Sequence, residues 1–250
     1  GNQFSSLSVI FRIRNGSQRI AYRNLFMDAA NAIVNPHPTE QNHILQPDGP
    51  PGDPVGSGAK DIDVAECFWG DPIGDVVRLV GNQDREISNI RVTRNSFNCV
   101  DALGAAAARS IISMQRGTTK VLIQGNFLKG SHDQQLDFEP SGANEPISEY
   151  AIIGNHLDHQ NQNTESVTIT GLPASLATNI LFAFNTVSNG SGIALLLTNR
   201  CSVMGNIVTV EAASPAPPFY SQNGDDNLQV LANVFVTTNA TSNVIPFTLI

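Results

Sequence analysis

The chain has 250 residues and a mass of 26.7 kDa, with 14 Lys and Arg against 22 Asp and Glu and a formal net charge of −8. A surface this acidic repels phosphate backbones and anionic lipids, which argues against nucleic acid and membrane surfaces as partners. Hydrophobic residues make up 41%, enough for a core, and no apolar run approaches the roughly 20 residues of a membrane span. Three widely spaced cysteines indicate neither a disulfide framework nor a zinc site.

A short phrase recurs along the chain: two or three alternating apolar residues, then Asn, any residue and an apolar residue. The first two copies, RIAYRNLF at Asn24 and DIDVAECF at Glu66, are degenerate, because their apolar alternation is displaced by one residue. The six clear copies are centred on Asn95, Asn126, Asn155, Asn185, Asn206 and Asn233. Their spacing of 21–31 residues, without ten-residue amphipathic helices between most copies, excludes βαβ units and predicts a solenoid of stacked parallel strands.

The positions around the recurring Asn indicate a strand with one buried face. The positions five and three residues before the Asn are apolar in all six clear copies, as Ile90 and Val92 are in the first. We expect the Asn to adopt left-handed backbone geometry and its amide to bond the Asn of the next coil, forming a ladder.

A second strand lies between consecutive Asn phrases, in residues 75–81, 110–116, 134–140, 166–171 and 192–198. Each alternates, so every second side chain is predicted to point outward and to align with its counterpart in the next coil. One outer column reads Arg78, Ser113, Asp137, Thr168 and Ala194. The neighbouring outer column reads Val80, Gln115, Glu139, Thr170 and Leu196.

Two or three strands per turn of about 28 residues suit a parallel β-helix. The chain resembles the pectin-lyase-like β-helix superfamily, which includes polysaccharide lyases, glycosidases, epimerases and phage tailspikes. We expect one all-β domain over 1–250, a single-stranded right-handed parallel β-helix of about seven or eight coils, with clear repeats over 87–235 and degenerate first coils over 19–81. The resemblance implies a secreted or virion-surface location.

Two insertions interrupt the repeats. Residues 35–58 are rich in Pro and Gly and too long for a plain turn, so we expect them to form a wall beside the outer face of one sheet. ASPAPPF, residues 213–219, is interpreted as an insertion in the sixth coil. The chain has no initiator Met, and we interpret it as a fragment of a longer one.

The stretch SHDQQLDFEPSG carries the candidate chemistry. Asp137 and Glu139 flank the inward Phe138, so their carboxylates share one face, with Cα atoms roughly 6.6–6.8 Å apart. An inverting glycosidase places its two carboxyl groups roughly 6.5–9.5 Å apart, and repulsion between them supplies an acid. Asp137 and Glu139 are therefore the predicted catalytic pair. The competing interpretation is a solvated pair without a function.

A lyase mechanism is the alternative chemistry. β-Elimination on a uronic acid needs a base and a positive charge that neutralises the substrate carboxylate, and Arg78 or His132 could serve in these roles. A calcium ion held by Asp137 and Glu139 could take part as well. Neither mechanism requires another cofactor. The predicted contacts to a polysaccharide or oligosaccharide are Arg78, Gln115, His132, Thr170 and the stacking ring of Trp69, with Tyr220 as a second aromatic candidate.

A second group of acidic residues and the short sequence motifs give weaker indications of a function. Asp53, Asp61, Asp63, Asp71 and Asp75 offer oxygen ligands for calcium but lack the spacing of a calcium loop, which favours solvated carboxylates. The Asp-x-Glu-Pro rung resembles one that recurs in β-helix proteins of phages and secreted polysaccharide-acting proteins. None of the phrases of polygalacturonases, alginate epimerases or pectate lyases is present.

Two function classes follow. The first is a carbohydrate-active domain that cleaves or modifies an extracellular polysaccharide in a groove along the solenoid. The second is a structural or adhesive β-helix that holds glycans without cutting them, as a monomer or a homotrimer. Outward apolar residues favour packing against a second subunit in that case, namely Val80, Ala194 and Leu196.

Overall fold

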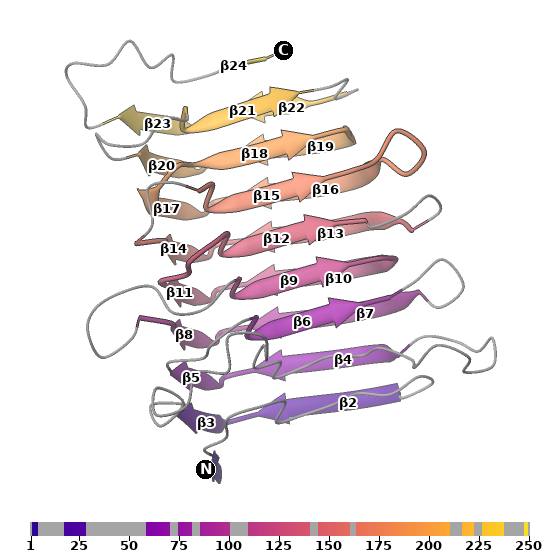
Figure 1. Ribbon diagram of the computed structural model, residues 1–250, viewed down its shortest axis with the longest axis vertical. Coiled ribbons are helices and arrows are strands. Elements are labelled where there is room, and N and C mark those ends of the chain that lie inside the picture. The colour runs from indigo at the N-terminus through magenta and orange to yellow at the C-terminus, as the bar shows by residue number, and fades with distance from the viewer. Residues whose placement is uncertain are drawn as a thin grey trace.

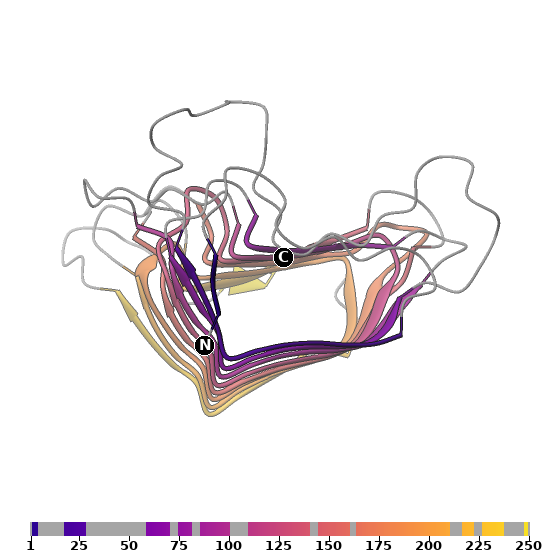
Figure 2. The same cartoon turned by 90° about the horizontal axis from the view of Figure 1, so that it is seen from below.

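The computed structural model describes residues 2–4, 18–28, 59–70, 75–81, 86–100, 110–140, 145–160, 164–210, 217–222, 227–237 and 248–249. In these residues the regular structure is β-strand, in three parallel sheets that run the length of a solenoid (Figure 1). Seen along the solenoid, the sheets form the walls around a common core (Figure 2). The predicted class, an all-β parallel solenoid, is confirmed. No helix in the described residues is long and apolar enough to cross a membrane.

The first sheet has nine short strands. In spatial order they are β1 (Asn2–Phe4), β3 (Leu25–Asp28), β5 (Phe68–Gly70), β8 (Ser96–Asn98), β11 (Phe127–Lys129), β14 (His156–Asp158), β17 (Thr186–Gly190), β20 (Ile207–Val210) and β23 (Val234–Thr237).

The second sheet contains eight strands, most of them longer than those of the first sheet. They are β2 (Gln18–Arg23), β4 (Lys60–Ala65), β7 (Ile87–Thr93), β10 (Thr118–Gln124), β13 (Ile147–Ile153), β16 (Ala177–Ala183), β19 (Thr198–Met204) and β22 (Gln229–Leu231).

The third sheet has seven strands and carries the candidate chemistry. They are β6 (Val77–Val80), β9 (Ile112–Gln115), β12 (Leu136–Glu139), β15 (Val167–Thr170), β18 (Ile193–Leu196), β21 (Phe219–Gln222) and β24 (Thr248–Leu249). The short β21 was missed, because residues 213–219 were interpreted as an insertion. Its first residue, Phe219, is fully buried and continues the inward column above Ile193.

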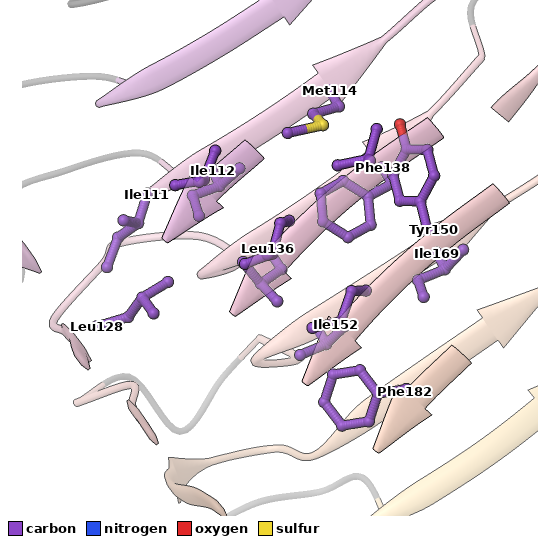
Figure 3. Packing of buried hydrophobic residues seen from close by; sticks show 14 of the residues in the cluster. Ile111, Ile112, Met114, Leu128, Leu136, Phe138, Tyr150, Ile152, Ile169 and Phe182 are labelled. Atoms are coloured by element: carbon purple, nitrogen blue, oxygen red, sulfur yellow. The ribbon is translucent and has the colours of Figure 1, made fainter. Parts of the chain in front are cut away.

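The core is built from the inward columns of all three sheets. Met114 and Phe138 come from the third sheet and Tyr150 and Ile152 from the second, and all four are at most 1% exposed (Figure 3). Phe138 meets Tyr150 edge to face, with ring centroids 5.0 Å apart. The core therefore fixes which residues of β12 point inward, and it leaves Asp137 on the outer face.

The predicted Asn ladder is confirmed. From Asn95 to Asn206, each Asn donates its side-chain N–H to the Oδ1 of the Asn in the next coil, over 2.9–3.1 Å. The backbone N–H of each donates to the same oxygen, over 2.8–2.9 Å. All five of these Asn side chains are buried and thus satisfied in the interior, where an unpaired amide would be costly.

The prediction that the Asn itself is left-handed is wrong. The residue before it has the positive φ, as at Arg94 (54°), Gly125 (63°) and Phe184 (57°). This residue turns the chain from the second sheet into the first. The Asn that follows is held by its ladder bonds, and its inward side chain needs no unusual backbone geometry.

In the second coil the ladder position lies one residue later than expected from the sequence. Cys67 donates its backbone N–H to Oδ1 of Asn95 at 3.0 Å, so Cys67, and not Glu66, occupies the ladder position. Glu66 has a φ of 58° and matches Arg94. With this register the apolar alternation of the second coil is regular. The expected wall of residues 35–58 lies outside the described residues.

Candidate functional site

The register of the third sheet brings the predicted outer columns together. The first column contains Arg78, Ser113, Asp137, Thr168 and Ala194 in neighbouring strands. In the second column Gln115 pairs with Glu139. Leu136 and Phe138 are fully buried, so Asp137 and Glu139 lie on the same outer face. Strand geometry separates their Cα atoms by about 6.6–6.8 Å.

Gln115 connects two charged residues across three coils. Its Oε1 accepts a hydrogen bond from a terminal N–H of Arg78 at 3.3 Å, and its Nε2 donates to Oε1 of Glu139 at 3.1 Å. Gln115 is only 7% exposed, which limits exchange of these bonds with water. One oxygen of Glu139 is therefore held in place. The described structure gives the other oxygen no hydrogen bond.

Asp137 lies between two hydroxyl side chains that lack hydrogen bonds. It pairs with Ser113 in the coil before and Thr168 in the coil after, and its side chain is mostly buried. The hydroxyl oxygens of Ser113 and Thr168 are both buried and have no hydrogen-bond partner among the residues that the structure describes. Buried hydroxyls are nearly always satisfied, so this pair of exceptions next to a carboxylate needs an explanation.

Arg78 is also anchored by Asp75, which lies just before its own strand β6. Its Nε lies 3.6 Å from Oδ2 of Asp75, which is fully buried and accepts the backbone N–H of Ser110 at 3.2 Å. A buried carboxylate next to a guanidinium is the arrangement in which both charges are tolerated inside a protein. Arg78 is thus part of the network that holds Glu139.

Two other predicted contacts lie elsewhere. His132 is on the turn before β12, its side chain is 75% exposed, and its Nδ1 lies 3.0 Å from Oδ1 of its neighbour Asp133. Trp69 points inward from β5, is 1% exposed and stacks on Phe97 with centroids 6.2 Å apart. The prediction that Trp69 offers a surface ring for sugar stacking is therefore wrong.

Other outer residues of the third sheet lie in the coils that follow the network of Arg78, Gln115 and Glu139. Thr170 is half-buried on β15 and pairs with Leu196. Tyr220 stands above Ala194 and donates its hydroxyl to Oε1 of Glu165 at 2.9 Å. Ala194 is 0% exposed, so the prediction that it offers an apolar contact surface is wrong.

The second acidic patch does not gather in the described residues. Asp61 accepts a hydrogen bond from Asn89 and Asp63 pairs with Arg23, both on the second sheet, whereas Asp75 precedes β6 of the third sheet. Asp53 and Asp71 lie outside the described residues. Among the described side chains, no group of three or more His, Cys, Asp or Glu is placed to hold a metal ion.

Sequence reasoning placed Ser113 and Thr168 in the right column but did not select them. The available signal was their position on either side of Asp137. Comparison with protein families, curated proteins and solved structures finds no match for this chain. The chemistry of the site is accordingly argued from its own geometry.

Proposed function

We propose that the chain is a carbohydrate-active β-helix that binds an extracellular polysaccharide along the third sheet and cleaves it at Asp137 and Glu139. One observation carries the proposal: two outward carboxylates share a face, and the unbonded hydroxyls of Ser113 and Thr168 flank one of them. Carboxylates and hydroxyls together match the donors and acceptors of a polyol chain.

Each carboxyl group has a role in this proposal. Glu139 accepts the amide of Gln115 with one oxygen and has the other free to take a proton from water, which suits a general base. Asp137 then protonates the glycosidic oxygen as general acid. The strand spacing favours an inverting hydrolase, in which a water molecule fits between the two groups.

The other residues of the face have supporting roles. Gln115 accepts a hydrogen bond from Arg78 and donates one to Glu139, so Gln115, held by Arg78, positions that carboxylate. Thr170, which is half-buried, contacts a sugar hydroxyl, and the buried hydroxyls of Ser113 and Thr168 flank Asp137. β-Elimination remains the alternative chemistry, with a calcium ion at the carboxylates, and its unsaturated product distinguishes it from hydrolysis.

A polysaccharide panel tests the proposal. The protein is incubated with neutral and acidic polysaccharides, and both new reducing ends and the absorbance of unsaturated products are measured. Asp137→Asn and Glu139→Gln should each lower turnover at least about a hundredfold, as expected for loss of acid or base catalysis. Glu149→Gln, at an exposed position of the second sheet, is the matched control. Unchanged turnover in both site variants would remove these residues from the mechanism.

The setting of this activity is also a proposal. A polysaccharide chain outside the cell suits a long repetitive surface, and a parallel β-solenoid is consistent with the resemblance of the sequence to the pectin-lyase-like β-helices. We therefore propose a secreted or virion-surface protein.

A non-catalytic scaffold is the second candidate function. Apolar side chains on the outside of the later coils favour it, because exposed apolar surface of this kind packs against a partner. These residues, 39–65% exposed, are Phe184, Ile207, Leu231, Val234 and Val236. As a scaffold, the chain would form a homotrimer and bind glycans without cleaving them. Light scattering measures the oligomeric state and the polysaccharide panel measures cleavage products, so together they distinguish the two functions.

A further inference from the structure

An aromatic slot lies on the outside of the first sheet, away from the candidate catalytic face. Ser96 of β8 pairs with Phe68 in the coil before and with Phe127 in the coil after. Phe68 and Phe127 are the first residues of β5 and β11, and their side chains point outward next to the inward Trp69 and Leu128. A small side chain is thus enclosed between two rings.

Each of the two rings stacks on an aromatic ring of a neighbouring coil. Phe68 stacks on Phe26 of the preceding coil, with centroids 4.8 Å apart and planes 10° apart. Phe127 stacks on His156 of the following coil, at 5.1 Å and 3°. Each stack uses one face of its ring. The other faces of Phe68 and Phe127 are turned toward each other across Ser96.

The spacing of the two rings selects what fits between them. Two rungs separate them by about 9.6 Å. A flat aromatic ring in contact with both would need only about 7–8 Å, twice a carbon–carbon contact distance. The extra width fits a puckered saturated ring, whose C–H groups contact both aromatic faces. The net charge of −8 argues further against a nucleobase carried on a phosphate backbone.

Polar groups lie at both ends of the slot. Before Ser96, at the corner, Arg94 donates through Nε and a terminal nitrogen to Oε1 of Glu66, at 3.0 and 2.7 Å. Both side chains are exposed, at 62% and 45%, and each keeps further hydrogen-bonding capacity. After Ser96, Asn98 has its side chain outward and half-buried, next to Gly70 of the preceding coil.

We infer that this slot binds one pyranose ring of a glycan, with Phe68 and Phe127 on its two faces. The sugar hydroxyls bond Arg94 and Glu66 at one end and Asn98 at the other. The slot lies on a different sheet from Asp137 and Glu139 and does not depend on their chemistry. The inference therefore goes beyond the proposed cleavage: it gives the solenoid a second, non-catalytic contact that holds a polysaccharide against it.

Filling the slot is the direct test. Ser96→Phe continues the Phe26–Phe68 stack and occupies the space between the rings, whereas Phe127→Ala removes one wall. Thr186→Phe is the matched control, because it adds a ring to the same outer column beyond His156 and leaves the slot open. Binding is measured by affinity electrophoresis in soluble galactomannan, xylan, polygalacturonate and alginate. All variants carry Asp137→Asn and Glu139→Gln to prevent degradation, and thermal melting checks their folding.

We expect at least one of these polysaccharides to retard the protein. Ser96→Phe and Phe127→Ala should each weaken that binding at least about tenfold, and Thr186→Phe should change it less than about twofold. Unchanged binding in a folded Ser96→Phe variant would overturn the inference, and so would no binding to any polysaccharide. If slot variants lose binding while Asp137→Asn alone keeps full turnover, only the cleavage proposal fails. If Asp137→Asn abolishes turnover while Ser96→Phe binds normally, only the slot fails.

Discussion

Asn126 donates both its side-chain and its backbone N–H to Oδ1 of Asn155, each at 2.9 Å. Asn155 in turn donates to the carbonyl of Ile123 at 3.0 Å and to Oδ1 of Asn185 at 2.9 Å. One buried amide therefore closes four hydrogen bonds among three coils. This is the physical reason why the Asn phrase recurs where the chain turns from the second sheet into the first.

Asn155→Ala should strongly destabilise the fold. It leaves two buried donors and two buried acceptors with a partner removed, and we expect a loss of about 3 kcal/mol in the free energy of unfolding, measured by urea denaturation. Asn233→Ala is the control, because Asn233 is only half-buried and water can replace its bonds. Its expected cost is about 1 kcal/mol. Equal costs at the two positions would show that burial of the ladder does not set its strength.

Acid should destabilise the protein through His159. This side chain is 0% exposed, and burial lowers its pKa from 6.5 to about 4, although the carbonyl of Asp133 and nearby carboxylates act in the opposite direction. The folded state therefore keeps the imidazole neutral where the unfolded chain already takes up a proton. Its contribution to stability is complete above pH 6.5 and is lost as the pH falls toward 4, by about 3 kcal/mol.

His159→Gln should remove this part of the pH dependence. The comparison is the difference in unfolding free energy between pH 7 and pH 4.5, so a uniform loss of stability in the variant does not affect it. His132→Asn is the control, since its side chain is 75% exposed, and it should retain the wild-type difference. A His159→Gln variant with the wild-type pH dependence would contradict the assignment.

Gly190 should not tolerate a side chain. A Cβ at this position would lie 2.2 Å from Oγ of Ser166 and 2.7 Å from Nδ1 of His159. Gly190→Ala should therefore cost about 1–3 kcal/mol in unfolding free energy, the usual range for overpacking. Gly154→Ala meets no atom within 4 Å and costs only the strain of its positive φ, about 1 kcal/mol. Thermal or urea unfolding of both variants tests whether Gly190→Ala lowers the unfolding free energy more than Gly154→Ala does.

Gln115 should matter for turnover more than for folding. Gln115→Leu keeps most of the buried volume but removes the bonds to Arg78 and Glu139, so Glu139 loses the contact that orients it. We expect turnover on the cleaved polysaccharide to fall about tenfold, with kcat affected more than KM. Gln124→Leu, exposed on the second sheet, should leave kcat unchanged. A Gln115→Leu variant with wild-type kcat would exclude the positioning role.

The rungs could be predicted from sequence because strand alternation and the Asn phrase are both local signals. A register error in the second coil shows the limit of this reasoning. When Glu66 is matched to the Asn, Trp69 falls on the outward position of Asn98; when Cys67 is matched, it falls on the inward position of Phe97. A shift of one residue exchanges the two faces of a strand. The repeat carries no Asn at this point to fix the register.

The candidate site was predictable only in part. The outer columns follow from the repeat, and they correctly align Ser113, Asp137 and Thr168. The columns do not show that Gln115 bridges Arg78 and Glu139, because this depends on how long side chains orient along the solenoid. The burial of Ala194 could not be predicted from the columns either. Tyr220 pairs with Ala194 in the next coil, and its side chain extends back to donate a hydrogen bond to Glu165.

A crystal structure of the Glu139→Gln variant soaked with an oligosaccharide of the cleaved polymer tests the central claim most directly. The account predicts a sugar chain along the third sheet, with a glycosidic oxygen within hydrogen-bond distance of Asp137 and a sugar hydroxyl on Thr170. A ligand bound only elsewhere on the solenoid, with Asp137 and position 139 unoccupied, would contradict it.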